Sequence, residues 1–414
     1  MKTKMSYLAV FFIFLCSLFL TSCGEQQEAQ APKEPEKVAE QKAEEPAKED
    51  KKLKAGFIYV GPVGDYGWSH AHDLGKKYAE EKFPWLETVI VESVAESDSM
   101  RIIDRLVQQQ NCDVVFTTSF GYMDDTIKAG TKYPDTQFMH CSGFKRSENV
   151  GTYFGDLYQM YYLNGLMAGA LTKTNKIGYV AAFPIPELVR HINAYALGVK
   201  AANPKASVDV KWIYAWYGPD KAKEAAEALI AEGCDALAFT EDTPAVIEVG
   251  QAHAEKGKEI MTFSHYSAMQ AYGVDSVVSG QYMDWGGIYA TILENIYTGK
   301  WNTKNMKDAD VLWLAKEKAA ILGGTATDPV NPKFVPALKE AMIDSAEFGS
   351  ISAYDLVMKR YAQMQEGREV FDPFTGPIND NKGELKIKEG EMASIGDLMS
   401  IMYYVDGVNG EIPQ

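Results

Sequence analysis

The chain is poor in basic side chains relative to acidic ones. Its 414 residues include 41 Lys and Arg against 57 Asp and Glu, which gives a formal net charge of -16. This surplus of negative charge argues against binding to a phosphate backbone or to an anionic membrane surface. The sequence also lacks a P-loop, a Gly-x-Ser-x-Gly elbow and a His-Glu-x-x-His motif, so these enzyme classes have no support.

Histidine and cysteine are scarce, with six and five residues. His70 and His72 are two positions apart on an expected helix, where side chains diverge by about 200°, so no metal site is predicted. Cys112, Cys141 and Cys234 are far apart, lie next to expected strands and lack metal-ligand spacing. We expect three buried free thiols rather than a disulfide framework, although the pairing of two of them stays open.

Long apolar runs are confined to the N-terminus, where Leu8 to Leu20 follows a basic start. This run is shorter than the roughly 20 residues of a membrane span and has the layout of a secretory signal. Leu20-Thr-Ser-Cys23 resembles a bacterial lipobox, which implies cleavage before Cys23 and acylation of its thiol. An ordinary signal peptide is the alternative. We therefore expect a signal at residues 1–23 and a disordered tether at residues 24–52.

Beyond the tether, short apolar runs alternate with helical patterns in two successive series. The expected strands are residues 55–60, 88–91, 113–116, 136–141 and 150–154, then 176–180, 208–214, 235–239, 259–263 and 276–279. The expected helices include one beginning after Ser69 and those at 98–110, 158–171, 186–202, 220–232, 244–256, 287–297, 335–346 and 354–366. Two series of this kind predict two lobes, each a parallel sheet flanked by helices, with a ligand cleft between them.

The loop from Gly61 to Gly75 follows the first strand, at the position where open α/β sheets bind ligands. It carries Asp65, Trp68 and Ser69. An indole beside a carboxylate suits a flat molecule that donates hydrogen bonds better than it suits a phosphate.

Similar clusters follow other strands. They are Phe120-Gly-Tyr122, Ala215-Trp-Tyr217, Glu241-Asp-Thr243, His265-Tyr266 and Gln281-Tyr-Met-Asp-Trp-Gly286. Aromatic and acidic residues recur in them and basic residues do not, which favours a neutral planar ligand with N–H donors over an anion.

Several motifs occur in an order that is specific to one family. They are Gly61-x-x-x-Asp65-x-x-Trp68, Tyr133-Pro-Asp135, Asn164-Gly-Leu-Met-Ala-Gly169, Lys176-Ile-Gly-Tyr-Val180, Gly198-Val-Lys-Ala-Ala-Asn-Pro204 and Asp372-Pro-Phe-Thr-Gly-Pro-Ile378. In these motifs the chain resembles the basic membrane protein family of ABC-transporter substrate-binding lipoproteins, which includes bacterial purine-nucleoside receptors.

The resemblance implies an α/β fold of the type I periplasmic-binding-protein class, with two lobes joined by hinge crossovers. Lobe 1 is then expected at residues 53–172 with about 285–320. Lobe 2 is expected at residues 173–284, with about 330–414 forming its remainder and a C-terminal extension.

The resemblance also implies an extracytoplasmic, lipid-anchored, monomeric receptor that delivers a purine to an ABC permease and needs no cofactor. Two aromatic residues, Trp68 and Trp216, fall on the positions that sandwich the purine in the family. Gly218 and Asp284-Trp285 depart from the family pattern on the sugar side, which favours a free base such as adenine over a nucleoside. The expected ligand-binding residues are Asp65, Trp68, Ser69, Phe120, Asn193, Trp216, Tyr217, Asp242, Asp284 and Trp285.

Other interpretations stay open on the sequence. Trp68 and Trp216 are also suited to packing, and Asp65 to capping its own turn or the following helix. A nucleoside or a riboflavin-type heterocycle is an alternative ligand. A lipid-anchored nucleoside hydrolase that uses Asp65 and Asp242 is the alternative from a different class.

Overall fold

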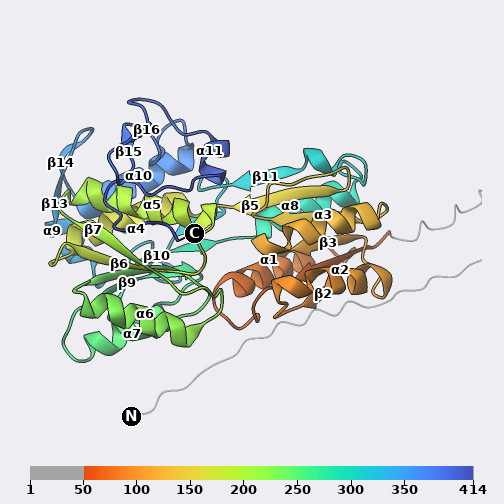
Figure 1. The fold of residues 1–414 in the computed structure, drawn as a ribbon, viewed down its shortest axis with the longest axis horizontal. Helices are drawn as coiled ribbons and strands as arrows, with labels where there is room; N and C mark the ends of the chain where they lie inside the picture. The colour runs from red at the N-terminus through yellow and green to blue at the C-terminus, as the bar shows by residue number, and fades with distance from the viewer. Residues whose placement is uncertain (1–50, 414) are drawn as a thin grey trace, which may run out of the picture. The chain divides into compact units, whose positions relative to one another are not determined.

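The structure is a computed structural model that describes residues 51–413 (Figure 1). The expected signal peptide, the lipidation site at Cys23 and nearly all of the expected tether lie outside the described residues.

Lobe 1 is organised around a six-stranded sheet in which all neighbouring pairs are parallel. Its strand order is β11-β5-β4-β3-β1-β2. The strands are β1 (Leu53–Ile58), β2 (Leu86–Val91), β3 (Val114–Thr117), β4 (Gln137–Cys141), β5 (Val150–Gly155) and β11 (Asp310–Trp313). The helices of this lobe are α1 (Trp68–Lys82), α2 (Ser99–Gln108), α3 (Met123–Lys132) and α8 (Gly286–Tyr297).

Lobe 2 repeats this topology with the order β12-β10-β9-β8-β6-β7. The strands are β6 (Lys176–Ala181), β7 (Ser207–Trp212), β8 (Ala236–Thr240), β9 (Met261–Tyr266), β10 (Val277–Met283) and β12 (Ala320–Leu322). The helices are α4 (Tyr158–Leu171), α5 (Pro186–Ala202), α6 (Pro219–Ala231) and α7 (Ala245–Ala254). Only β12 runs antiparallel to its neighbour among these described strands. The prediction of two parallel-sheet lobes is confirmed.

The chain crosses between the sheets three times, after β5, after β10 and after β11. The first crossover lies near Asp156, earlier than the expected boundary at residue 172, because α4 packs along α5. Glycines allow this close approach: a Cβ on Gly165 would lie 2.1 Å from the Tyr195 carbonyl oxygen, and one on Gly198 would lie 2.0 Å from that of Tyr162. Helix α4 therefore belongs to lobe 2.

The C-terminal extension packs on lobe 2. It contains α9 (Val335–Glu340), β13 (Met342–Ser345), β14 (Gly349–Ser352), α10 (Ala353–Glu366), β15 (Ile378–Asn379), β16 (Leu385–Ile387) and α11 (Ile395–Met399). The expected helix at 335–346 was too long, since its second half pairs as β13 with β14.

Residues 403–413, the last that the structure describes, form a segment that we call the strap. Its residues 407–409 lie along β7, the edge strand of the lobe 2 sheet. The Val208 N–H donates to the Gly407 carbonyl at 2.8 Å, and the Asn409 N–H donates to the Val208 carbonyl at 2.9 Å. The strap therefore pairs backbone groups that an open edge would leave free.

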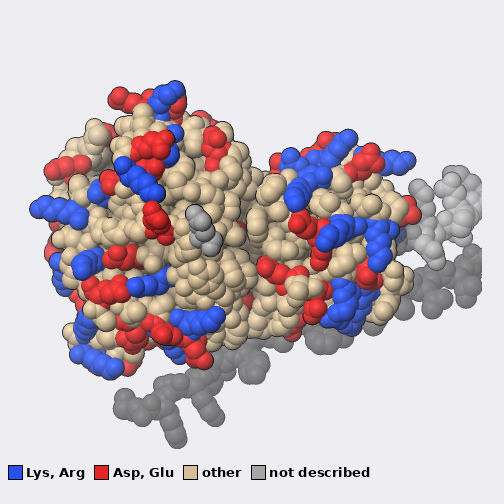
Figure 2. Space-filling model, in the orientation of Figure 1, with Lys and Arg blue, Asp and Glu red and all other residues tan. Residues whose placement is uncertain are grey.

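Cys112, Cys141 and Cys234 are free and buried, as predicted. Basic and acidic side chains are interspersed on the face shown in Figure 2. From residue 51 to residue 413, no helix has both the length and the apolar character that crossing a membrane requires.

Candidate ligand-binding site

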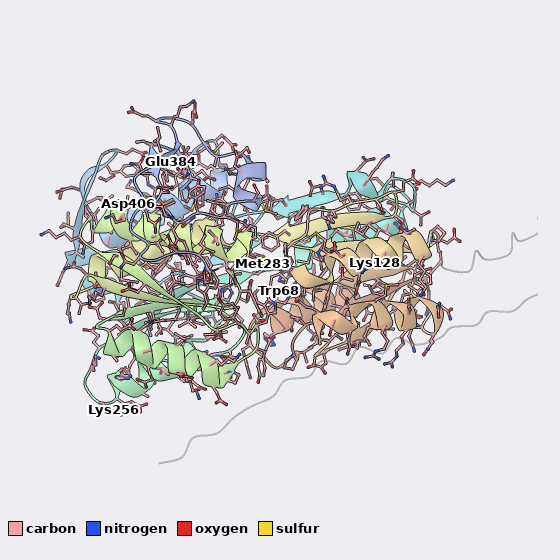
Figure 3. The ribbon with its side chains drawn as sticks, viewed as in Figure 1. Trp68, Lys128, Lys256, Met283, Glu384 and Asp406 are labelled. Atoms are coloured by element: carbon pink, nitrogen blue, oxygen red, sulfur yellow. The ribbon has the colours of Figure 1, made fainter. Side chains whose placement is uncertain are left out.

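A small cavity of about 20 Å³ is lined by residues of both lobes. Its walls are Val60, Trp68, Ser119, Phe120 and Ser142 from lobe 1, and Glu187, Trp216, Thr240, Asp242 and Tyr266 from lobe 2. Figure 3 shows Trp68 where the two lobes meet. Most of these residues follow the carboxyl end of a parallel strand, so the topology of the two sheets brings them together.

Trp68 is the first residue of α1, and its indole is held on several sides. Its Nε1–H donates to the Thr118 carbonyl oxygen. The rings of Tyr266 and Trp285 meet it edge to face, with centroids 5.2 Å and 5.4 Å away. Its orientation is therefore set by packing before any ligand arrives.

Trp216 reaches the cavity from the loop after β7, in the opposite lobe. It is half-buried and packs on Phe183 at a centroid distance of 5.1 Å. Its carbonyl oxygen accepts the Asp242 N–H at 2.8 Å. The loop after β8 thus supports the second indole.

Carboxylates from both lobes cap the first turn of α1. Asp65 accepts the N–H groups of Gly67, Ser69 and His70 at 2.8 to 3.1 Å. The Trp68 N–H instead donates to Oδ1 of Asp242, a residue of lobe 2, at 3.3 Å. One N–H at the start of α1 is therefore satisfied by the opposite lobe, as helix N-termini require.

The loop before α1 makes further contacts with lobe 2. The Ser267 hydroxyl donates to the Tyr66 carbonyl oxygen, and the Tyr66 and Tyr272 rings lie edge to face at 5.3 Å. Gly67 approaches Asp242 so closely that a Cβ would lie 2.7 Å from the Asp242 Cα. These contacts hold the lobes against each other at the cavity.

Two acidic side chains of the cavity have raised pKa values. Burial raises the pKa of Glu187 from 4.5 to about 7, and burial followed by the charge of Asp65 raises the pKa of Asp242 well above its ordinary value. The Tyr266 hydroxyl donates to Oε1 of Glu187 at 3.3 Å. A protonated carboxyl offers one donor and one acceptor side by side, as a side-chain amide does.

Four of the ten expected binding residues line the cavity: Trp68, Phe120, Trp216 and Asp242. The other six do not line it. The side chains of Asp65 and Ser69 accept hydrogen bonds from backbone N–H groups of their own loop. Asp65 accepts from Gly67, and the Ser69 hydroxyl accepts from Gly61 at 3.0 Å. Asn193 binds the Tyr403 carbonyl and the Val405 N–H of the strap.

The remaining three are placed away from the cavity for separate reasons. The Tyr217 ring is 51% exposed to solvent. Asp284 accepts the Gly286 N–H at 2.8 Å in a local turn. Trp285 is fully buried behind Trp68 and stacks on His72 at 4.0 Å, so it supports the site from behind.

The sequence reasoning missed Glu187, Ser119, Ser142, Thr240 and Val60, and it flagged Tyr266 only as part of a cluster after a strand. Ser142 and Tyr266 both lie at the end of a strand and have positive φ angles of 58° and 61°. A strand end followed by a sharp turn was the available signal for these two. Glu187 sits in the first turn of α5, where an acid is common for helix-dipole reasons, so it carried no such signal.

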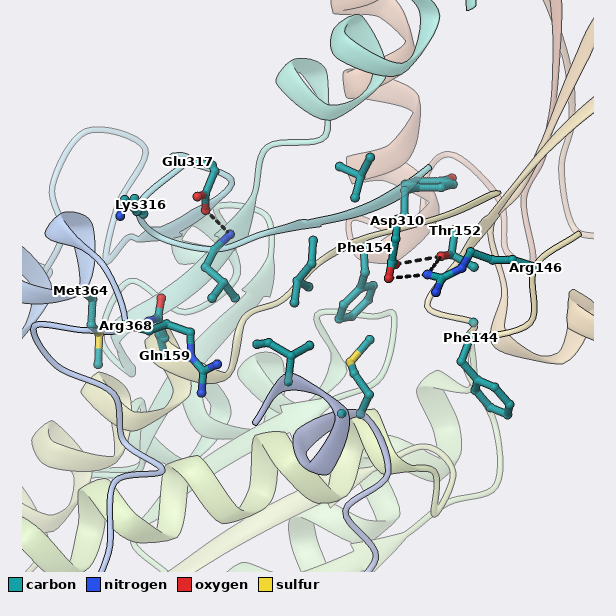
Figure 4. A pocket seen from close by; sticks show the side chains of 18 of the residues that line it. Phe144, Arg146, Thr152, Phe154, Gln159, Asp310, Lys316, Glu317, Met364 and Arg368 are labelled. Atoms are coloured by element: carbon teal, nitrogen blue, oxygen red, sulfur yellow. Dashed lines mark hydrogen bonds and ion pairs between the residues drawn. The ribbon is translucent and has the colours of Figure 1, made fainter. Parts of the chain in front are cut away.

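A wider groove of about 590 Å³ lies between lobe 1 and the C-terminal extension (Figure 4). Arg146 donates to Thr152 and pairs with Asp310 on one side of it, and Arg368 lies on the other.

Within residues 51–413, no group of three or more His, Cys, Asp or Glu side chains is arranged to hold a metal ion.

Two similar parallel-sheet lobes, three crossovers and a cavity walled by both lobes define the type I periplasmic-binding-protein fold. The family follows from the sequence comparison. Residues 52–314 match the model of the Bmp family, described as ABC transporter substrate-binding protein PnrA-like, and the chain belongs to this family.

Two relatives cover most of the chain. A purine-binding protein of Brucella abortus is 34% identical over 367 residues, which is 88% of this chain and 95% of the relative. A protein of Haloferax volcanii, named provisionally as an ABC transporter glucose-binding protein, is 37% identical over 311 residues, or 74% of this chain and 76% of the relative.

Solved structures support the fold. A solute-binding protein of an ABC transporter system from Aeropyrum pernix matches 76% of this chain and 92% of its own with a TM-score of 0.63 and 17% identity. One from Conexibacter woesei matches 76% of this chain and 97% of its own with a TM-score of 0.55 and 18% identity.

Proposed function

We propose that this protein is the extracytoplasmic receptor of an ABC importer for a purine, with the free base adenine preferred. The observation that carries the proposal is the cavity wall, which has one indole from each lobe, Trp68 and Trp216. A planar ring held between them would contact both lobes at once. The ligand would then stabilise the closed arrangement, which is the one that the permease recognises.

The acidic groups of the cavity support a purine with an exocyclic amine. Glu187 and Asp242 line it, and both have raised pKa values because they are buried. A carboxyl of this kind accepts a hydrogen bond from the exocyclic amine of adenine. When it is protonated, it also donates a hydrogen bond to the adjacent ring nitrogen. Asn and Gln read the same edge of adenine by pairing one donor with one acceptor.

A purine nucleoside and a riboflavin-type heterocycle are the alternative ligands within the same fold. The name of the Haloferax relative makes glucose a further alternative ligand, because the hydroxyl groups of a sugar can also donate hydrogen bonds to Glu187 and Asp242.

The proposed membrane attachment is a lipid on Cys23, which mass spectrometry of the mature N-terminus would detect. A nucleoside hydrolase that uses Asp65 is disfavoured, because the Asp65 carboxylate accepts three backbone N–H groups from its own loop and the start of α1.

Calorimetry with adenine, hypoxanthine, adenosine, riboflavin and glucose tests the ligand class. We expect adenine to bind most tightly, and adenosine incubated with the protein to stay intact by chromatography. Trp68→Ala and Trp216→Ala should each weaken adenine binding by about 5- to 150-fold, because stacking on an aromatic face is worth about 1–3 kcal/mol per base.

Tyr217→Ala is the matched control, because Tyr217 is next to Trp216, is exposed and does not line the cavity. Its adenine affinity should equal that of the wild type. Unchanged affinity in both Trp variants would refute the sandwich, and binding of glucose without binding of any purine would refute the ligand class.

A further inference from the structure

The wider groove between lobe 1 and the C-terminal extension is large enough to hold a small molecule. Its volume of about 590 Å³ falls within the roughly 300–1,000 Å³ that is typical of small-molecule pockets. One wall comes from β5, β11 and the loop before β5, and the other includes residues of α10 and α11. The groove shares no lining residue with the small cavity between Trp68 and Trp216, so the two spaces are separate.

Apolar side chains make up much of the groove wall. Phe154 and Leu312 contribute from lobe 1, and Met364 and Met399 contribute from the C-terminal extension. Phe144, at the lobe 1 side of the groove, is 61% exposed, although large apolar side chains are usually buried. A ligand with an apolar body would cover this surface and gain the free energy of its burial.

Each basic side chain that lines the groove already has an acidic partner. The pairs are Arg146 with Asp310, Lys316 with Glu369 and Arg368 with Asp372. Among the described residues that line the groove, no basic group is therefore left to balance an anion. A phosphate or a nucleotide would lose its hydration without gaining a counter-ion, so the groove favours an uncharged ligand.

One buried hydrogen-bond donor in the groove wall lacks a partner. The side chain of Gln159 is fully buried, and its Oε1 accepts the Ala315 N–H at 3.2 Å. Within residues 51–413, no atom accepts a hydrogen bond from Nε2 of Gln159. Figure 4 shows this side chain among those that line the groove. A buried amide donor without an acceptor is costly, and an acceptor on a ligand would remove that cost.

We propose that the groove is a second small-molecule site, which takes an uncharged molecule with an apolar body and a carbonyl-type acceptor for Nε2 of Gln159. The apolar body would lie on Phe154 and Leu312. Simple aliphatic amides have this chemistry. The site does not depend on which ligand occupies the cavity between the two indoles, so the inference goes beyond the proposed function.

Gln159 also lies at the hinge. It follows the first crossover near Asp156, and Ala315 follows β11 at the third crossover, so their hydrogen bond joins two of the connections between the lobes. A ligand in the groove would contact lobe 1 and the extension that packs on lobe 2. It would therefore favour the arrangement in which the lobes meet at Gly67, and its binding should be linked to binding in the interlobe cavity.

Calorimetry at pH 7 with hexanamide, hexanoate and hexylamine tests the inference in the absence of purine. We expect hexanamide to bind most tightly, because hexanoate is an anion and hexylamine is a cation without an acceptor. Gln159→Met keeps the length of the side chain and removes the donor. It should weaken hexanamide binding by at least about fivefold, because the carbonyl of the ligand is then left unpaired.

Ile395→Trp is a second variant, at a half-buried position of α11 that lines the groove, and it should fill the groove and abolish hexanamide binding. It leaves Gln159 unchanged, so it tests the site even if Gln159→Met does not fold. Met402→Trp is the matched control, because Met402 is 48% exposed and does not line the groove. Its affinity for hexanamide should equal that of the wild type.

Three results would overturn the site: no saturable binding of hexanamide, tighter binding of hexanoate than of hexanamide, or unchanged hexanamide binding in Ile395→Trp. Saturating hexanamide should also tighten adenine binding, by the same factor by which adenine tightens hexanamide binding. An unchanged adenine affinity would overturn the link to the hinge. Hexanamide binding without binding of any purine would refute the proposed function and leave the groove site in place.

Discussion

Gly67 lies against the backbone of the opposite lobe, and replacing it by alanine should hold the cavity open. An added Cβ would lie 2.7 Å from the Cα and 3.0 Å from the Cβ of Asp242 in the opposite lobe. The nearest atom belongs to the backbone, so no side-chain rotation can relieve the overlap. Separating the lobes relieves it fully, and that separation also breaks the bond from the Trp68 N–H to Asp242.

The expected magnitude follows from the cost of overpacking, which is about 1–3 kcal/mol for an added methyl group in a packed site. Because this cost applies to the closed arrangement, the population that can hold ligand falls and the apparent affinity falls with it. We therefore expect Gly67→Ala to weaken adenine binding by about 5- to 150-fold. Gly67 itself does not line the cavity, so this effect does not come from a lost contact between Gly67 and the ligand.

Calorimetry measures the affinity, and small-angle X-ray scattering with saturating adenine measures closure. Gly64→Ala is the matched control, since a Cβ on Gly64 of the same loop would meet no atom within 4 Å. The melting temperature without ligand should be similar in both variants. The reasoning is refuted if Gly67→Ala binds adenine like the wild type and closes to the same dimensions.

Three further substitutions test other parts of the structure. Burial raises the pKa of Glu187 from 4.5 to about 7, so its contribution to stability is full below pH 4.5 and is lost as pH rises through 7. In urea unfolding, wild type should therefore lose roughly 3 kcal/mol relative to Glu187→Gln as pH rises from below 4.5 to above 7, and a difference that stays constant with pH would contradict this. Asn193→Ala should speed hydrogen exchange in the strap without changing ligand affinity, and a weaker affinity with an unchanged strap would contradict the contacts described here. Asp156→Ala should lower the free energy of unfolding by about 3–5 kcal/mol, because it leaves the buried Arg190 cation without its partner, and a loss no larger than that of an exposed pair would contradict this.

The fold could be predicted from the sequence because the buried strands are short apolar runs with clear ends. Residues 113–116 and 235–239 illustrate this, as they match β3 and β8 closely. The positions of Trp68 after β1 and of Asp242 after β8 could also be predicted, because the carboxyl ends of parallel strands lie at the same edge of a sheet.

The direction of individual side chains could not be predicted in the same way. Asp65 lies in the expected loop, but its carboxylate turns back to the N–H groups of α1. Trp285 lies after the expected strand, yet it packs behind Trp68 because α8 lies against α1. Loop sequence gives the position of a residue along the chain, whereas its orientation depends on partners that are distant in sequence.

The pocket walls show the same limit more strongly. Phe144 and Met399 meet at one cavity although they belong to lobe 1 and the C-terminal extension. No local pattern relates two such residues, so only the assembled structure brings them together.

The strap has a consequence for the order in which the chain can fold. Strand β7 finds its outer partner only when residues 407–409 are present, and β5 finds β11 only when residues 310–313 are present. A chain synthesised from its N-terminus cannot complete either lobe until late, so neither lobe can finish folding as an independent early unit. Pairing across such long sequence separations is intrinsically slow, and a chain that ended before Val405 would leave the edge of β7 open to other chains.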